Sequence, residues 1–240
     1  TQRLYFLAIA KKYNLWVIED AAQGIMSTYK HRPLGSIGDL GTYSFHETKN
    51  VISGEGGALL VNNPLFVDRA EIIREKGTNR SQFFREQIDK YTWVDIGSSY
   101  LPGEVISAFL SAQFDEADSI TRQRMANWDH YHDALQDLEI SGHLRRPIVP
   151  EDCRHNAHMY YILLPSPDKR TELIRNLRDR GINAVFHYVP LHDSPEGLRK
   201  ARVHGDMKNT HYIAERLLRL PMWVGMDVQQ VVDAINEVIC

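Results

Sequence analysis

Residues 15–23 of the chain read LWVIEDAAQ, an apolar run that ends in two acids. Four consecutive apolar residues from Leu15 to Ile18 predict a strand buried on both faces, as in a parallel sheet covered by helices. Asp20 follows at the carboxyl end of this strand, the edge of an open α/β sheet where ligands bind. An aspartate in this place can equally cap the next helix. The stretch therefore predicts an α/β fold and makes Asp20 a candidate site residue.

Two further stretches supply a hydroxyl and an amine in addition to the acid Asp20. Residues 44–50 read SFHETKN and follow a strand predicted over 42–45, and residues 54–57 read GEGG, a turn before a strand at 58–61. Taken alone, Lys49 is a solvated surface lysine. Acid, hydroxyl and lysine on successive strands together match the needs of pyridoxal phosphate, namely an acid at its ring nitrogen, donors for its phosphate and an amine that holds it.

The remaining sequence continues the alternation of helices and strands. Apolar residues recur at spacings of three and four over 103–138, which predicts one long helix or two in series bridging two domains. We expect the larger domain to end near residue 120 and a smaller α+β domain to fill 121–240. The other predicted elements are a helix over 66–76 closed by Gly77, a polar excursion over 78–99, strands over 159–164 and 183–188, and helices over 169–180, 213–220 and 228–239.

Composition and charge argue against a nucleic-acid-binding protein. The net charge is −3 and the pI about 6.4, whereas a surface that binds nucleic acid needs clustered basic residues. Two cysteines form neither a disulfide framework nor a metal pair, and a reducing cytoplasm is the default compartment. His155 and His158 lack a third ligand, so no metal site is expected. His130 and His132 lie two apart on the long helix and are expected at the surface.

The stretches over 17–23, 44–50 and 54–57 resemble the DegT/DnrJ/EryC1/StrS sugar aminotransferases. This resemblance implies the aspartate-aminotransferase-like fold, pyridoxal-phosphate-dependent transferase fold type I, with pyridoxal 5'-phosphate as the cofactor. It implies that Lys49 holds the cofactor and moves the proton, that Asp20 pairs with the pyridine nitrogen and that Ser44 binds the phosphate. It further places Gln23 near the ring hydroxyl. His46 packs against the cofactor or fills space near it.

One position departs from the pattern of the family. Many members carry an asparagine in a G-x-N-x-R segment that reaches the phosphate in the partner subunit. Residues 97–101 read GSSYL, which places Ser99 at that position. The resemblance implies a homodimer, with the excursion over 78–99 as a plausible contact.

Residues 74–100 and 184–192 resemble one subgroup, which makes dTDP-4-amino-4,6-dideoxygalactose for enterobacterial common antigen. The reaction implied is amino transfer from L-glutamate to C4 of dTDP-4-keto-6-deoxyglucose, leaving 2-oxoglutarate. In the family the segment with His187, Tyr188 and His192 lies near the sugar, although packed aromatics at a strand end explain these residues equally well.

The start of the chain bears on how much of such an enzyme is present. The sequence begins at Thr1 without methionine and in a helix-like stretch, and the N-terminal portion of the family is absent from it. We interpret the chain as the larger, C-terminal part of the enzyme. The alternatives are a non-catalytic fragment of the same fold, or a dehydratase of the same superfamily, against which the amine of Lys49 argues.

Overall fold

The computed structural model describes residues 2–239 of the chain, with side chains from residue 5 onward. These residues form two compact units: unit 1 comprises the described residues up to 120 together with 151–156, and unit 2 comprises 121–150 and the described residues from 157 onward. The division falls within one helix, α5 (Ala117–Ala134). Within the described part of the chain, no helix combines the length and the apolar character needed to span a membrane.

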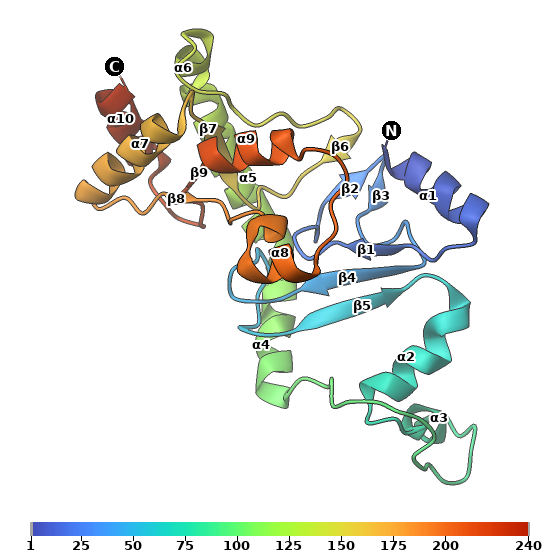
Figure 1. Cartoon of the computed structure of the whole chain (residues 1–240). Helices are drawn as coiled ribbons and strands as arrows, with labels where there is room; N and C mark the ends of the chain where they lie inside the picture. Colours follow the sequence, from blue (N-terminus) through green and yellow to red (C-terminus); the bar gives the residue numbers. More distant parts are fainter. Residues whose placement is uncertain (1, 240) are drawn as a thin grey trace. The chain divides into compact units, whose positions relative to one another are not determined.

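Unit 1 is built around a three-stranded sheet in the order β1-β4-β5 (Figure 1). β1 and β4 are parallel, with Asp20 opposite Thr42, and β5 runs antiparallel to β4, with Gly57 opposite Ser44. The carboxyl ends of β1 and β4 and the start of β5 therefore meet at one edge of the sheet. The elements of this unit are α1 (Gln2–Tyr13), β1 (Ile18–Asp20), β2 (Thr28–Tyr29), β3 (Arg32–Pro33), β4 (Leu40–Ser44), β5 (Gly57–Val61), η1 (Pro64–Phe66), α2 (Val67–Arg74), α3 (Arg80–Phe84), α4 (Glu104–Asp115) and β6 (Cys153–Arg154).

The first strand differs from its prediction. The strand itself begins only at Ile18, and Leu15, Trp16 and Ile18 are each more than half exposed (58%, 58% and 63%). Within the described residues β1 pairs with β4 alone, so it is an edge strand and not a central one. The prediction of a strand buried on both faces is wrong for this chain, because burial depends on neighbours that a run of apolar letters does not specify.

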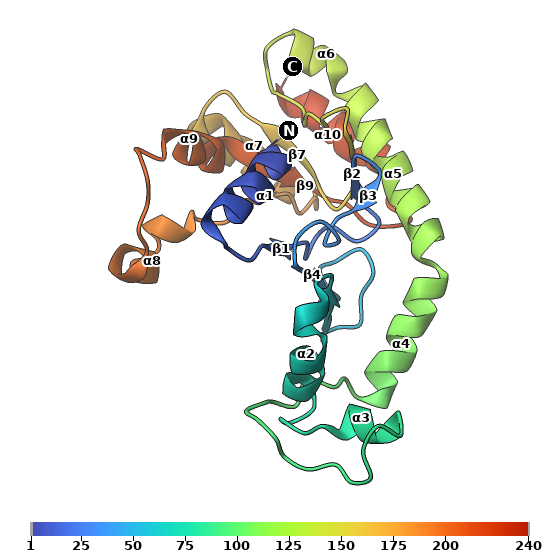
Figure 2. The same cartoon turned by 90° about the vertical axis from the view of Figure 1, so that its right-hand side faces the viewer.

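A small core anchors the loop that follows β4. Phe45 and Val51 are almost fully buried and pack with Ile25 and Ala117. The ring of Phe45 meets Phe114 of α4 edge-on, with 5.4 Å between the centroids. Figure 2 shows α4 and the start of α5 along this part of the sheet. The residues between Phe45 and Val51, including Lys49, are thus held at both ends by buried apolar side chains.

Unit 2 has its own sheet, in the order β7-β9-β8 with antiparallel pairing throughout. Its elements besides α5 are α6 (Gln136–Ile140), β7 (Tyr160–Leu163), α7 (Pro167–Asp179), β8 (Val185–Phe186), η2 (Leu191–Asp193), α8 (Pro195–Lys200), α9 (Lys208–Arg216), β9 (Leu217–Leu220) and α10 (Val228–Ile239). Local signals explain α7: the Ser166 hydroxyl accepts a hydrogen bond from the Lys169 N–H, Pro167 is the first helical residue, and Gly181 follows the end with φ of +77°.

Two helix predictions need correction. The periodic stretch over 103–138 forms three helices, α4, α5 and α6, with breaks at Glu116 and Leu135. The helix expected over 213–220 ends at Arg216, and Leu217–Leu220 is the central strand of the second sheet. Four apolar-rich residues do not distinguish helix from strand, and here pairing with β7 on one side and β8 on the other decides for strand.

The prediction that His132 lies at the surface is wrong. Its ring stacks on Trp128 with 4.6 Å between centroids, and it is half-buried instead of lying on the surface. Burial lowers the pKa of His132 below its ordinary value, and the nearby charge of Arg146 lowers it further. His130, by contrast, is exposed as expected.

Candidate functional site

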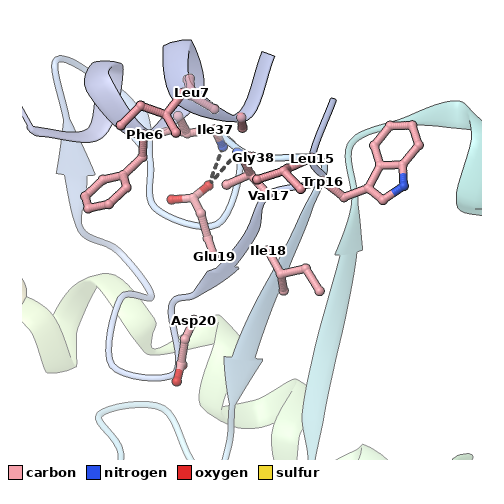
Figure 3. A pocket seen from close by; sticks show the side chains of 12 residues that line it. Phe6, Leu7, Leu15, Trp16, Val17, Ile18, Glu19, Asp20, Ile37 and Gly38 are labelled. Atoms are coloured by element: carbon pink, nitrogen blue, oxygen red, sulfur yellow. Dashed lines mark hydrogen bonds between the residues drawn. The ribbon is translucent and has the colours of Figure 1, made fainter. Parts of the chain in front are cut away.

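Two adjacent acids at the end of β1 have different roles. Figure 3 shows Glu19 directed at the backbone of residues 37 and 38, whereas Asp20 points away from them. The Glu19 carboxylate accepts hydrogen bonds from the N–H groups of Ile37 and Gly38, at 2.5 and 2.9 Å. Alternation along a strand sends the next side chain to the other face. Asp20 is exposed and accepts a hydrogen bond from the Ala22 N–H at 3.1 Å, so Glu19 secures the loop while the Asp20 carboxylate remains open to solvent.

Lys49 lies in a loop whose backbone is closed by hydrogen bonds. The Phe45 N–H donates to the Gly56 carbonyl at 2.9 Å, and the Ser53 N–H donates to the Phe45 carbonyl at 2.7 Å. The Lys49 N–H donates to the His46 carbonyl at 2.9 Å, which sets the turn that presents the lysine. Lys49 is half-buried, and among residues 2–239 no hydrogen bond or ion pair engages its Nζ. The amine is therefore on a fixed backbone and available for chemistry.

A pair of buried asparagines joins the loop over residues 45–53, the Lys49 loop, to residues 20–25, the Asp20 segment. The Asn50 side chain donates to the Asn156 carbonyl at 2.7 Å. The Asn156 side chain donates in turn to the carbonyls of Gln23 and Ile25, at 2.9 and 2.7 Å. Sequence reasoning missed Asn156, because it lies 106 residues beyond Asn50 and carries no local signal. These bonds make Asn50 and Asn156 positioning residues for the candidate site.

The other expected residues at this edge take different roles. Ser44 ends β4, and its hydroxyl accepts a hydrogen bond from the His46 N–H at 3.4 Å. The Nδ1 of His46 accepts a hydrogen bond from the Thr48 N–H at 3.2 Å, so in its neutral form the ring carries its proton on Nε2. His46 is thus part of the turn before Lys49. Gln23 exposes its side chain and contributes its carbonyl to the asparagine bridge.

The donor set at this edge fits pyridoxal phosphate. Asp20 and Ser44 end adjacent parallel strands, and Lys49 follows on the loop tied back to the Asp20 segment. A carboxylate, a hydroxyl and an amine are the groups that would meet the ring nitrogen, the phosphate and the aldehyde carbon. Ser99 lies elsewhere in unit 1, exposed and paired in a short bridge with Glu75.

A cavity of about 490 Å³ opens between α1 and β1 in unit 1. Its lining is mostly apolar, and Asp20 is the one expected site residue that borders it (Figure 3). Lys49 and Ser44 are not part of it, so this cavity does not coincide with the candidate cofactor site.

Unit 2 holds the three residues expected near the sugar. His187 and Tyr188 have ring centroids 5.4 Å apart and line a groove of about 410 Å³. Burial lowers the pKa of His187, and the charge of Arg219 lowers it further. Arg219 also lies over the Tyr188 ring, 5.3 Å from its centroid. His192 is turned toward Asp193 and His211.

Comparison with known proteins identifies the family. The model of the DegT/DnrJ/EryC1/StrS aminotransferase family matches residues 5–238. The chain belongs to this family. The spore coat polysaccharide biosynthesis protein SpsC of Bacillus subtilis is 30% identical, over 97% of this chain and 62% of that protein. A GDP-perosamine synthase of Escherichia coli O157:H7 is 28% identical, over 95% of this chain and 60% of that protein.

Solved structures agree with this assignment. The structure of DesV from S. venezuelae superposes with a TM-score of 0.83 at 25% identity, over 99% of this chain and 61% of that one. The expected fold type I architecture and the expected class, an aminotransferase family that uses pyridoxal phosphate, are confirmed. The chain spans about 60% of the length of the curated relatives it matches.

Proposed function

We propose that this chain forms the main part of an enzyme that transfers an amino group from L-glutamate to C4 of a nucleotide-linked keto-sugar. The proposed acceptor is dTDP-4-keto-6-deoxyglucose, giving dTDP-4-amino-4,6-dideoxygalactose and 2-oxoglutarate. The observation that carries the proposal is the meeting of Asp20, Ser44 and the Lys49 loop at one sheet edge, joined by the Asn50–Asn156 bridge. The match to a family of sugar aminotransferases supports the reaction class.

Each of these residues has a specific task. Bound pyridoxal phosphate supplies an electron-withdrawing ring that makes a proton on the neighbouring substrate carbon removable. Lys49 would hold the cofactor through Nζ and would carry the proton taken from the α-carbon of glutamate. Asp20 would pair with the ring nitrogen, and the Ser44 hydroxyl would bind the phosphate. Gln23 would lie near the ring hydroxyl, and His46 shapes the turn that presents Lys49.

Unit 2 is proposed to provide the sugar contacts. His187 and Tyr188 line an open groove, so we assign direct contact with the sugar nucleotide to them. His192 makes contacts with Asp193 and His211, so we assign it to holding their segment in place.

The proposed assembly is a homodimer. Large apolar side chains are exposed along 93–109, including Trp93 at 73%, Ile96 at 78% and Val105 at 82%. Exposed apolar surface of this extent is typical of protein–protein contact. Ser99 lies within this segment, from which we propose that it reaches the phosphate in the partner subunit. Light scattering that gives the mass of a single chain would contradict this arrangement.

The proposed anchor is tested by trapping. The chain is mixed with pyridoxal phosphate, reduced with borohydride and mapped by mass spectrometry. We expect the label on Lys49, and its loss in Lys49→Ala, whereas the exposed Lys76 serves as a matched control whose substitution leaves the label in place. A label spread over several lysines would contradict the assignment.

The proposed reaction needs a separate measurement. Turnover is followed as 2-oxoglutarate formed from glutamate with dTDP-linked and GDP-linked 4-keto-6-deoxy sugars, because one relative is named as a GDP-perosamine synthase. Asp20→Ala is expected to retain the borohydride label and to lose turnover. Near-wild-type turnover in this variant would remove Asp20 from the mechanism.

A further inference from the structure

Two histidines and an aspartate converge in unit 2, outside the residues assigned to the cofactor. The Nε2 atoms of His192 and His211 are 3.1 Å apart. The Asp193 carboxylate places Oδ2 at 2.9 Å from His211 Nε2 and Oδ1 at 3.5 Å from His192 Nε2. His211 lies on α9, 19 residues beyond His192, so only folding brings the three together.

The spacing of these atoms matches a metal site. Zinc binds imidazole nitrogen and carboxylate oxygen at about 2.0–2.2 Å, usually in tetrahedral geometry. Ligand atoms at the corners of such a tetrahedron lie roughly 3.3–3.6 Å apart. The three separations of 2.9, 3.1 and 3.5 Å need shifts of only a few tenths of an ångström to meet this geometry.

Without a metal, one shared proton must hold the three groups together. A neutral imidazole nitrogen either donates or accepts, and a carboxylate only accepts. If only His211 Nε2 carries a proton, that proton serves both Asp193 Oδ2 at 2.9 Å and His192 Nε2 at 3.1 Å. If only His192 Nε2 carries it, two acceptors lie 2.9 Å apart, and if both do, two donors meet at 3.1 Å. A cation accepts electron pairs from all three atoms at once.

The backbone holds His192 and Asp193 in place without a metal. Both lie on η2, which is followed by a turn in which the Ser194 hydroxyl donates to the Leu191 carbonyl at 2.7 Å and accepts from the Gly197 N–H at 3.0 Å. A Cβ at Gly197 would come within 1.8 Å of the Leu191 carbonyl oxygen, so only glycine allows this packing. Two ligands are thus pre-positioned, which lowers the entropic cost of binding an ion.

The cluster is also reachable from solvent. The His192 side chain is 14% exposed, but Asp193 and His211 are 38% and 41% exposed and border the groove of about 410 Å³. Three protein ligands and an open side are the arrangement in which a metal keeps a water or another ligand in its fourth position.

We propose that His192 Nε2, one carboxylate oxygen of Asp193 and His211 Nε2 bind a divalent transition metal ion of the zinc type. Imidazole nitrogens favour Zn²⁺, Ni²⁺ and Cu²⁺ over Mg²⁺ and Ca²⁺. The bound ion fastens η2 to α9 beside the groove lined by His187 and Tyr188. The three proposed ligands are not among the residues assigned to the cofactor or to direct contact with the sugar, and metal binding can be measured without either.

The test is titration of Zn²⁺ into the metal-free, tag-free chain by calorimetry, with Co²⁺ as a spectroscopic probe. We expect one equivalent to bind and Co²⁺ to show the visible absorption of a tetrahedral N/O site. His211→Ala and Asp193→Asn should each weaken Zn²⁺ binding by more than about 100-fold, the upper end of what loss of an outer-shell partner costs. His204→Ala, which removes an exposed histidine outside the cluster, should bind as the wild type does.

Two results would overturn the proposal. One is the absence of stoichiometric Zn²⁺ binding to the wild-type chain. The other is wild-type affinity in both His211→Ala and Asp193→Asn, with circular dichroism showing that both are folded. Neither measurement needs pyridoxal phosphate, and trapping at Lys49 needs no metal, so failure of this proposal and failure of the proposed function are distinguishable.

Discussion

Asn156→Ala is the most direct test of how the candidate site is held together. Asn156 is 4% exposed and lies on a short segment that belongs to unit 1. The substitution removes both side-chain donors that reach the Asp20 segment, at Gln23 and Ile25. It leaves the Asn156 carbonyl, and hence the bond from Asn50, in place.

The loss of local stability expected for Asn156→Ala follows from the two hydrogen bonds that it removes. The bond to the Ile25 carbonyl is buried, and a buried acceptor that loses its donor costs about 1–3 kcal/mol. The bond to the Gln23 carbonyl is only partly buried, so water can replace the donor and the cost is about 0.5–1 kcal/mol. Together these give a loss of about 1.5–4 kcal/mol of local stability. With this loss, the segment is expected to open roughly 10 to 900 times more often.

Hydrogen exchange measured by mass spectrometry reports how often each segment of the backbone opens. We expect faster exchange in peptides covering 21–27 and 45–53, together with a lower yield of the borohydride label at Lys49. Asn183→Ala, an exposed asparagine of unit 2, is the matched control and should change neither. Unchanged exchange in both peptides of Asn156→Ala would refute the reasoning that Asn156 positions the site.

Two further predictions concern unit 2. Because the folded protein holds the pKa of His132 below about 6.5, the unfolded chain takes up a proton first on acidification, and the stability present at pH 7.5 is lost as the pH falls through 6.5. His132→Phe, which keeps a ring against Trp128, should reduce the fall in the urea midpoint between pH 7.5 and 5.5, and an unchanged fall would contradict this assignment. Burial lowers the pKa of Arg124 to about 10, so Arg124 stays charged at neutral pH. Its guanidinium donates to three backbone carbonyls within unit 2. Arg124→Met should therefore lower the free energy of urea unfolding of that unit by about 3 kcal/mol or more. A loss below about 1 kcal/mol would show that the three bonds contribute little.

Prediction from the sequence succeeded where the signal was local. The strand at β4, the turn before β5 and the helix α7 between Pro167 and Gly181 all follow from alternation, glycine and capping residues. It failed at Leu217–Leu220 and at Leu15–Ile18, because the same apolar letters suit a helix, a central strand or an edge strand. Only the partners of a segment decide among these, and partners are set by the whole fold.

The candidate site divides in the same way. The sequence by itself indicated the family, because residues 17–23, 44–50 and 54–57 resemble its motifs, and it proposed Asp20, Ser44 and Lys49 as candidate site residues. Only the tertiary structure decided which residues position these candidates, and that His192 lies next to His211. The contacts from Asn156 to the Asp20 segment and from His192 to His211 join residues 133 and 19 positions apart, and no local pattern encodes them. The buried bond from Asn156 to the Ile25 carbonyl forms because polar groups that folding removes from water must pair with each other.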